Sequence, residues 1–247
     1  MIEYISSRQN SKIKEVTKLF QMSEKKAQGK FIIEGYHLLE MALSAKKVSA
    51  VFSLKEEKSV PSSIPQYIVT PEVLEKISLT KSSQGVVAIC TMKEEKEIES
   101  SNVLYLDDVS DPGNMGTLLR TALAFGYKDV LVSPNSCSIY NEKVIQASQG
   151  AIFTLNVKTC DIAGLKKLND YQILATEIKG SIDIRDVKEI GKHILVLGNE
   201  ARGVRKEILQ LASQRIRIDI EDMESLNVAI AGGIAMYSLS RLVSRKD

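Results

Sequence analysis

Three polar segments, each following an apolar run, hold the side chains of this 247-residue chain that could do chemistry. The first covers residues 107–121, where a Pro-Gly turn leads into a helical pattern. Free amides at the start of such a helix can bind an anion. Arg120 lies farther along, among leucines and alanines, where an arginine either reaches water with its head group or is held for a purpose. The residues alone leave a structural salt bridge and a functional role for Arg120 equally open.

The second polar segment is a glycine-framed turn after the apolar run 194–197. Gly198 and Gly203 have no side chain, so a ligand could approach the backbone closely there. Between them, Glu200 is a single carboxylate near a predicted helix N-terminus, where it could simply stabilise the helix dipole. Taken alone, the dipole is the simpler explanation of Glu200.

The third polar segment leads into a helix of small and apolar residues. Ser225 is well placed to cap that helix, which puts Asn227 in its first turn. Gly232 and Gly233 follow, although a glycine inside a helix costs about 1 kcal/mol relative to alanine. Two in succession suggest that another backbone comes very close. Dense core packing and a subunit interface both satisfy this pattern.

The glycines of the first segment also test a dinucleotide-binding fold. Such a fold requires Gly-x-Gly-x-x-Gly directly after its first strand. Gly113 and Gly116 give only Gly-x-x-Gly, and the nearby acids would repel a pyrophosphate: Asp107, Asp108 and Asp111. A Rossmann oxidoreductase is therefore a distant alternative, which nicotinamide-cofactor binding would test.

Strand-like and helix-like stretches alternate through the second part of the chain. Apolar strands separated by helices predict an α/β fold with a parallel sheet covered on both faces. Ligands bind such sheets beyond the carboxyl ends of the strands, where the polar segments lie. Asn114 is placed to cap the helix of the first segment, and Gly126 to end it. The predicted strands are 103–106, 130–132, 173–175, 194–197 and 216–218, and the predicted helices are 115–125, 142–149, 162–168, 204–211 and 226–243.

A smaller α/β unit of about 90 residues, an ordinary domain size, precedes this part. Asn10 or Ser11 caps its first helix, and Thr70-Pro71 begins its last. The intervening run 93–102 is charged, as expected of an exposed linker. We therefore predict an N-terminal domain at 1–92, a linker at 93–102 and a second domain at 103–247. The predicted elements of the first domain are strands 31–33, 48–52 and 85–90 and helices 36–44 and 72–77.

Composition and charge exclude several function classes. Three widely spaced cysteines and two histidines provide no disulfide framework and little material for a zinc site or a Ser-His-Asp hydrolase, so we expect no metal. No apolar run reaches the roughly 20 residues of a membrane span, and the N-terminus lacks a signal-peptide layout. We therefore expect a cytoplasmic protein with no membrane partner. Residues 1–30 carry seven basic and three acidic side chains, which could meet nucleic-acid phosphates, although a solvated helix face explains the same pattern.

Taken together, the three polar segments resemble the sequence motifs of the SpoU (TrmH) family of RNA ribose methyltransferases, in the SPOUT class. Residues 114–122 resemble the first motif, 197–203 the second and 224–229 the third. The resemblance covers roughly residues 103–243. The first part of the chain resembles the small α/β substrate-binding domain, similar to certain ribosomal proteins, that often precedes this catalytic domain. That likeness is carried by residues 7–14, 31–35 and 84–88.

The resemblance implies a fold, a cofactor and an assembly. The catalytic domain would carry a mostly parallel sheet and a deep C-terminal trefoil knot that binds S-adenosyl-L-methionine, and it would form a homodimer. Periodicity alone predicts no knot, because open sheets almost never thread loops. By motif position, the cofactor-binding residues would be Gly198, Ile218 and Leu226, with Thr176 as a further neighbour.

The implied reaction moves a methyl group from a sulfonium to a ribose 2′-hydroxyl, so the enzyme aligns the reactants and removes a proton. The resemblance makes Arg120 the catalytic arginine, with Asn114, Glu200, Ser225 and Asn227 completing the site. An arginine base is chemically demanding, because the pKa of guanidinium lies above about 12. We therefore hypothesise that Arg120 clamps the phosphate beside the target ribose and stabilises the developing alkoxide, with that phosphate assisting proton removal.

The N-terminal domain would hold the RNA. Candidate phosphate contacts, which position RNA without reading its sequence, are Arg8, Lys12, Lys14 and Lys18. With no tryptophan and 5% aromatic residues, we expect recognition by RNA shape and backbone. The accessory domain favours ribosomal RNA, with transfer RNA as the alternative. A non-catalytic RNA-binding or ribosome-assembly protein of the same fold is the rival class; the complete set of motif residues speaks against it, and absence of S-adenosylmethionine binding would revive it.

Overall fold

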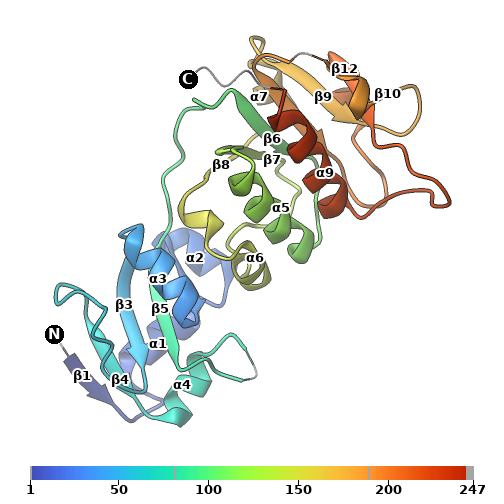
Figure 1. Ribbon diagram of the computed structural model, residues 1–247. Coiled ribbons are helices and arrows are strands. Elements are labelled where there is room, and N and C mark those ends of the chain that lie inside the picture. Colours follow the sequence, from blue (N-terminus) through green and yellow to red (C-terminus); the bar gives the residue numbers. More distant parts are fainter. Residues whose placement is uncertain (1, 81, 189, 243–247) are drawn as a thin grey trace. The chain divides into compact units, whose positions relative to one another are not determined.

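The computed structural model describes residues 2–80, 82–188 and 190–242 in two compact units (Figure 1). The first unit contains the chain up to Glu94 together with Tyr140–Phe153, and the second contains Glu95–Ile139 and the chain from Thr154 onward. One segment of the region that we assigned to the catalytic domain, Tyr140–Phe153, therefore packs into the first unit. Among the described residues, no helix is long and apolar enough to cross a membrane.

The first unit is built on a five-stranded mixed sheet. Its elements are β1 (Ile2–Ile5), α1 (Ser11–Lys18), α2 (Met22–Gln28), β2 (Lys30–Glu34), α3 (Tyr36–Ser44), β3 (Val48–Ser53), β4 (Gln66–Val69), α4 (Pro71–Ile77), β5 (Val86–Thr91), α6 (Glu142–Ser148) and the 3₁₀ turn η1 (Ala151–Phe153). The strand order is β1-β4-β3-β5-β2, in which β1, β4 and β3 are parallel and β5 is antiparallel to both its neighbours. Asn10 caps α1, as predicted, by accepting a hydrogen bond from the Lys12 amide.

The helix α2 and the segment Tyr140–Phe153 are held together by a buried lysine. The Lys25 side chain is 1% exposed and donates to the Tyr140 carbonyl at 2.8 Å and to the Glu142 carboxylate. A buried charge requires such partners. Phe31 of β2 packs against Tyr140, with ring centroids 4.9 Å apart. The sequence pattern did not indicate α2, because the residue that this helix buries is a lysine.

The second unit is built on a seven-stranded sheet in which every pairing is parallel. Its elements are β6 (Asn102–Leu106), α5 (Pro112–Ala124), β7 (Asp129–Val132), β8 (Asn156–Thr159), α7 (Ile162–Lys166), β9 (Gln172–Thr176), β10 (Ile182–Asp183), the 3₁₀ turn η2 (Ile184–Asp186), β11 (His193–Leu197), α8 (Lys206–Leu209), β12 (Gln214–Arg217) and α9 (Val228–Ser240). The order is β10-β12-β9-β11-β6-β7-β8. The central strand β11 is buried throughout, which confirms the predicted α/β architecture with a covered parallel sheet. The trefoil knot stays a prediction.

Two predicted helix caps were wrong, and both errors concern motif residues. The helix α5 begins at Pro112, and Asp111 caps it by accepting a hydrogen bond from the Asn114 amide at 2.7 Å. Proline suits the first helical position because its missing N–H is not needed there. Likewise, Asn227 rather than Ser225 caps α9 and accepts from the Ala229 and Ile230 amides. The Asn114 side chain and Ser225 therefore cap neither helix, and they remain available for other contacts.

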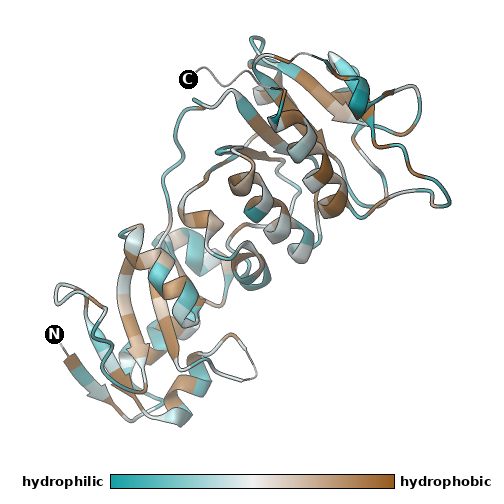
Figure 2. Cartoon of the chain, viewed as in Figure 1, coloured by the Kyte–Doolittle hydropathy of each residue, from teal (hydrophilic) through white to brown (hydrophobic). Residues whose placement is uncertain are grey.

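Small residues on α9 let it pack against α5 and β11. A Cβ at Gly232 would lie 2.5 Å from Leu118 Cδ2 and 2.6 Å from Leu197 Cδ1, which is closer than real contacts allow. At Gly233 the nearest atom would be Thr121 Cγ2 at an ordinary 3.7 Å. Side chains, not the second backbone we expected, therefore occupy the space beside these glycines. Figure 2 shows that α9 is largely apolar along its length.

Candidate active site

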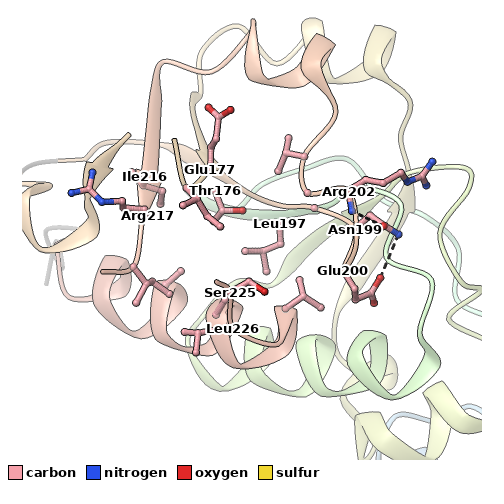
Figure 3. Close-up of a pocket in the computed structure, with 18 of the residues that line it drawn as sticks. Thr176, Glu177, Leu197, Asn199, Glu200, Arg202, Ile216, Arg217, Ser225 and Leu226 are labelled. Carbon is pink, nitrogen blue, oxygen red and sulfur yellow. Dashed lines mark hydrogen bonds between the residues drawn. The ribbon is translucent and has the colours of Figure 1, made fainter. Parts of the chain in front are cut away.

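A cavity of about 610 Å³ opens in the second unit beyond the carboxyl ends of three neighbouring strands, β12, β9 and β11. This is where a parallel sheet is expected to bind a ligand. The strand ends contribute Thr176, Leu197 and Ile216, and the start of the α9 segment contributes Ser225 and Leu226 (Figure 3). All four residues expected at the cofactor line this cavity: Thr176, Gly198, Ile218 and Leu226.

The wall of the cavity after β11 is a tightly closed turn. Asn199 and Gly203 exchange backbone hydrogen bonds of 3.1 and 2.9 Å. The Asn199 side chain accepts from the Ala201 and Arg202 amides and donates to the Asp108 carbonyl at 2.8 Å. Sequence reasoning did not single out Asn199, although an asparagine between a glycine and a motif glutamate is a frequent turn former.

Gly198 is required by the chain's own path. A Cβ at this position would overlap the backbone of Gly203 and Val204. We expected a ligand to come close to this glycine, but the group that lies closest to it is the backbone of Gly203 and Val204. This close approach brings the 199–204 turn directly over the end of β11.

The structure joins one residue from each motif in a single hydrogen-bonded chain. The Asn114 amide nitrogen donates to Glu200 Oε1 at 3.0 Å, and Asn227 Nδ2 donates to Asn114 Oδ1 at 2.9 Å. Asn227 Oδ1 faces the first amides of α9, which fixes the orientation of its side-chain amide. Because the Glu200 carboxylate can only accept, the direction of every hydrogen bond in the chain is determined.

The Glu200 carboxylate is surrounded by donors. Besides Asn114, the Ser110 hydroxyl, the Asp111 amide and the Asn199 side chain each lie 3.4 Å from one of its oxygens. Burial by itself would raise the pKa of Glu200, but the hydrogen bonds from Asn114 and from backbone amides outweigh burial, so that the pKa lies below its ordinary value. Glu200 is therefore a charged acceptor that holds two motifs together, and a poor proton acceptor at neutral pH.

The other two expected catalytic residues are not part of this chain of hydrogen bonds. Ser225 is exposed and lines the cavity. Arg120 is exposed on α5 and has neither a hydrogen bond nor an ion pair with any residue that the structure describes. It lies six residues after Asn114, about 9 Å along the helix axis and about two-thirds of a turn around it. Within one chain, Arg120 is thus not brought to Glu200, and the salt bridge that we held open is not formed among the described residues.

The candidate RNA-contacting side chains of the first unit differ in whether they already bind other residues of the chain. Arg8 donates to the Glu72 carbonyl at 2.8 Å and to Glu75 at 3.0 Å. Lys12 donates to the Tyr67 hydroxyl at 3.1 Å. Two further candidates are exposed one helical turn apart on α1 and make no ion pair with a described residue: Lys14 and Lys18.

The described residues include no group of three or more histidine, cysteine, aspartate or glutamate side chains that could hold a metal ion. The expectation of a metal-free reaction stays a prediction. Charged side chains of both signs line the cavity: Glu177, Glu200 and Glu224 are acidic, and Lys179, Arg202, Lys206 and Arg217 are basic.

The sequence matches two family models. Residues 101–237 match the SpoU rRNA Methylase family, and residues 10–88 match the MRM3-like substrate binding domain. The 23S rRNA (guanosine(2553)-2'-O)-methyltransferase RlmP of Bacillus subtilis is 29% identical over 246 residues, covering 96% of this chain and 99% of that protein. Two crystal structures of an rRNA methyltransferase from Sinorhizobium meliloti cover 97% of this chain and 98% of their own. Their TM-scores are 0.88 at 25% identity and, for the AdoMet-bound form, 0.87 at 24%.

Proposed function

Because the chain belongs to the SpoU rRNA methylase family, we propose that it transfers the methyl group of S-adenosyl-L-methionine to a ribose 2′-hydroxyl of ribosomal RNA. The observation that carries this proposal is the meeting of the three motifs. Glu200, Asn114 and Asn227 form one hydrogen-bonded chain at the edge of a cavity that all four expected cofactor residues line. We also propose a cytoplasmic location, where such a substrate is found.

The cavity suits S-adenosyl-L-methionine in size and in chemistry. Its volume of about 610 Å³ lies within the range of small-molecule sites. Ile216, Leu226 and Val228 provide apolar walls for an adenine ring, and Glu177 and Glu224 provide negative charge near a ligand with sulfonium and ammonium cations. When bound, the cofactor supplies a methyl group that is already activated for transfer.

The protein's task in this reaction is to orient and to stabilise. The Glu200 carboxylate keeps its negative charge and fixes the Asn114 amide, which in turn holds Asn227 at the start of α9. This arrangement positions Ser225 and Leu226, which directly precede Asn227, at the cavity. No described residue takes up the donors of Arg120, so they are available for a phosphate of the RNA, where a guanidinium fork can bind two oxygens and stabilise the alkoxide that forms.

We propose that the active unit is a homodimer, in which Arg120 acts on the site of the partner chain. Three large apolar side chains are exposed on α9 at helical spacing, as expected of a buried interface: Ile230, Ile234 and Tyr237. The helix α9 packs on α5, which carries Arg120, and the Tyr237 ring lies 5.7 Å from that of Phe125 just after α5. A second chain on this face would complete a site that one chain leaves without its arginine.

The first unit would hold the RNA through the exposed lysines of α1. Its match to a substrate-binding domain model supports that role, and Lys14 and Lys18 are the basic candidates left unpaired by described residues. We propose 23S ribosomal RNA as the substrate, with a guanosine as the methylated nucleoside, by similarity to RlmP.

Mapping of 2′-O-methyl groups tests this function. Ribosomal and transfer RNA from cells with and without the protein would be compared, and the purified protein would be incubated with unmodified 23S RNA and labelled S-adenosylmethionine. We expect one ribose methylation in 23S RNA to disappear without the protein and to be restored in vitro. Loss of a transfer-RNA methylation instead would identify the alternative substrate. A chain that binds the RNA but not the cofactor would be a non-catalytic relative.

A further inference from the structure

We propose that Asp107 and Arg205 are positioning residues for the cofactor, as a buried clamp that holds the 198–205 turn against the end of β6. The inference rests on the proposed function and adds to it two residues outside the three motifs. Asp107 directly follows β6 and is 0% exposed. From the sequence, Asp107 stood out only as an acid that would repel a pyrophosphate.

The geometry of the clamp is specific. Arg205 Nε donates to Asp107 Oδ1 at 2.7 Å, and the Arg205 backbone amide donates to Oδ2 at 2.9 Å. Arg205 Nη2 lies 2.6 Å from the same Oδ1 as an ion-pair contact, without hydrogen-bond geometry. Both carboxylate oxygens are thus engaged by one residue. The Asp107 amide in turn donates to the Leu197 carbonyl at 2.8 Å. A single aspartate therefore ties the end of the neighbouring strand β11 and the far end of the turn that follows it.

What the clamp holds is the wall of the cavity. The turn between these two anchor points contains Gly198, and the Asn199–Gly203 pair closes its tip. Arg205 also precedes α8, from which Lys206 and Leu209 line the cavity. Because Gly198 already touches the Gly203 and Val204 backbone, the turn cannot settle inward if the clamp is lost. We expect it to move away from β11 and widen the cavity.

The neighbouring arginine forms a looser contact than the clamp. Arg202 is 74% exposed and approaches the buried Asp108 at 3.6 Å without a hydrogen bond, so it lacks the short directional contacts that Arg205 makes with Asp107. The Arg205 side chain is 31% exposed, and its partner is fully buried. For such a pair, removal of one member leaves an unpaired buried charge. A lysine at 205 would neutralise Asp107 but could not form the two-nitrogen contact.

The test compares cofactor binding with catalysis in three variants of the full-length protein: Arg205→Gln, Arg205→Lys and Asp107→Asn. We expect each to raise the KM for S-adenosylmethionine about tenfold or more, with kcat at saturating cofactor changed less than about threefold. Arg205→Lys should have a melting temperature close to that of the wild type, above that of Arg205→Gln, but its KM for S-adenosylmethionine should stay raised. Lys192→Gln is the matched control, because it removes one positive charge from an exposed pair with Asp170 in the same unit.

Hydrogen exchange without cofactor provides a second readout that does not depend on activity. We expect amides of the 198–206 segment to exchange at least about tenfold faster in Arg205→Gln, with β6 and α9 unchanged. Unchanged exchange in this segment, or full rescue of the cofactor KM by lysine, would overturn the clamp. If the wild-type protein binds no S-adenosylmethionine, the proposed function fails, and the exchange experiment still decides whether Asp107 and Arg205 hold the turn.

Discussion

The side chains of Asn114 and Glu200 lie 86 residues apart in sequence and 3.0 Å apart in space, with the amide of the asparagine donating to the carboxylate. This contact places the first motif, at the start of α5, on the second, after β11. Asn227 extends it to the third motif. The roles of these three residues are therefore linked.

Glu200 should act by holding Asn114 and not by accepting the ribose proton. Glu200→Gln replaces an acceptor of several hydrogen bonds by an amide that must also donate, and we expect kcat to fall about tenfold or more. Since the pKa of Glu200 lies below its ordinary value, the carboxylate is charged throughout the neutral range and would be protonated only in acid. If Glu200 were the base, its protonation would make the wild-type rate fall in acid, and this acid limb would be absent from the variant. A pH–rate profile from acid to neutral pH checks this: we expect the wild type and Glu200→Gln to keep the same profile shape, and loss of an acid limb only in the variant would identify Glu200 as the base.

Arg120→Lys should lower turnover without weakening cofactor binding. Lysine retains the charge but offers a point donor in place of a fork, so a bidentate phosphate contact is lost. We expect kcat/KM for RNA to fall about tenfold or more, while the dissociation constant of S-adenosylmethionine measured by calorimetry stays the same. Full turnover in the lysine variant would contradict the clamp on the phosphate.

Mixed dimers should reveal whether Arg120 works across the interface. Chains with Arg120→Ala and chains with Glu200→Gln would be tagged differently, co-expressed and purified as heterodimers. If the arginine serves the partner's site, one of the two sites carries both changes and the other carries none, so about half of the wild-type activity should return. If it serves its own site, both sites are impaired, and the heterodimer should be as inactive as its parents.

The exposed side chains of α9 should be the dimer contact. Ile234→Glu places a charge in the middle of the apolar stripe, where burial without a partner is costly. We expect a monomer by analytical ultracentrifugation, with the helical content retained and activity lost. Leu54→Glu is the control, because Leu54 is 47% exposed in the first unit and outside the proposed interface. A dimer that survives the change at position 234 would place the interface elsewhere.

His193 should make the fold sensitive to acid. Its ring is 0% exposed and pairs with the Tyr127 hydroxyl at 2.8 Å, and burial lowers its pKa. The unfolded chain therefore takes up a proton at a higher pH than the folded chain. The stability from a neutral His193 is present above the ordinary value of 6.5 and is lost as pH falls toward the lowered pKa. Urea unfolding at pH 7.5 and 5.5, in wild type and in His193→Asn, should show a smaller pH effect in the variant; His37→Asn, at an exposed position, should behave as wild type.

Much of the fold was predictable because burial leaves a pattern in the residues. The apolar run 194–197 within β11 and the alternation of strands and helices predicted a parallel sheet, and the ends of its strands predicted where the cavity lies. Short edge strands such as β8 and β10 were missed, since they bury little. The start of α5 was misplaced for a local reason. Asp111 and Asn114 are both good capping residues, but Pro112 suits the first position of a helix, so the helix begins there and Asp111 is its cap.

The sequence by itself determined the covered parallel sheet and the residue types of the site. Only the tertiary structure decided which of those residues meet. It joins Asn114, Glu200 and Asn227, leaves Arg120 apart in the single chain, and pairs the buried Asp107 with Arg205 across 98 residues. It also places Tyr140–Phe153 in the first unit, where the buried Lys25 binds the Tyr140 carbonyl. The sequence could not indicate this contact, because lysine is usually exposed. The physical reason is that local propensity and periodicity are properties of neighbouring residues. The pairing of buried charges and amides depends on which strand ends lie side by side in the folded sheet.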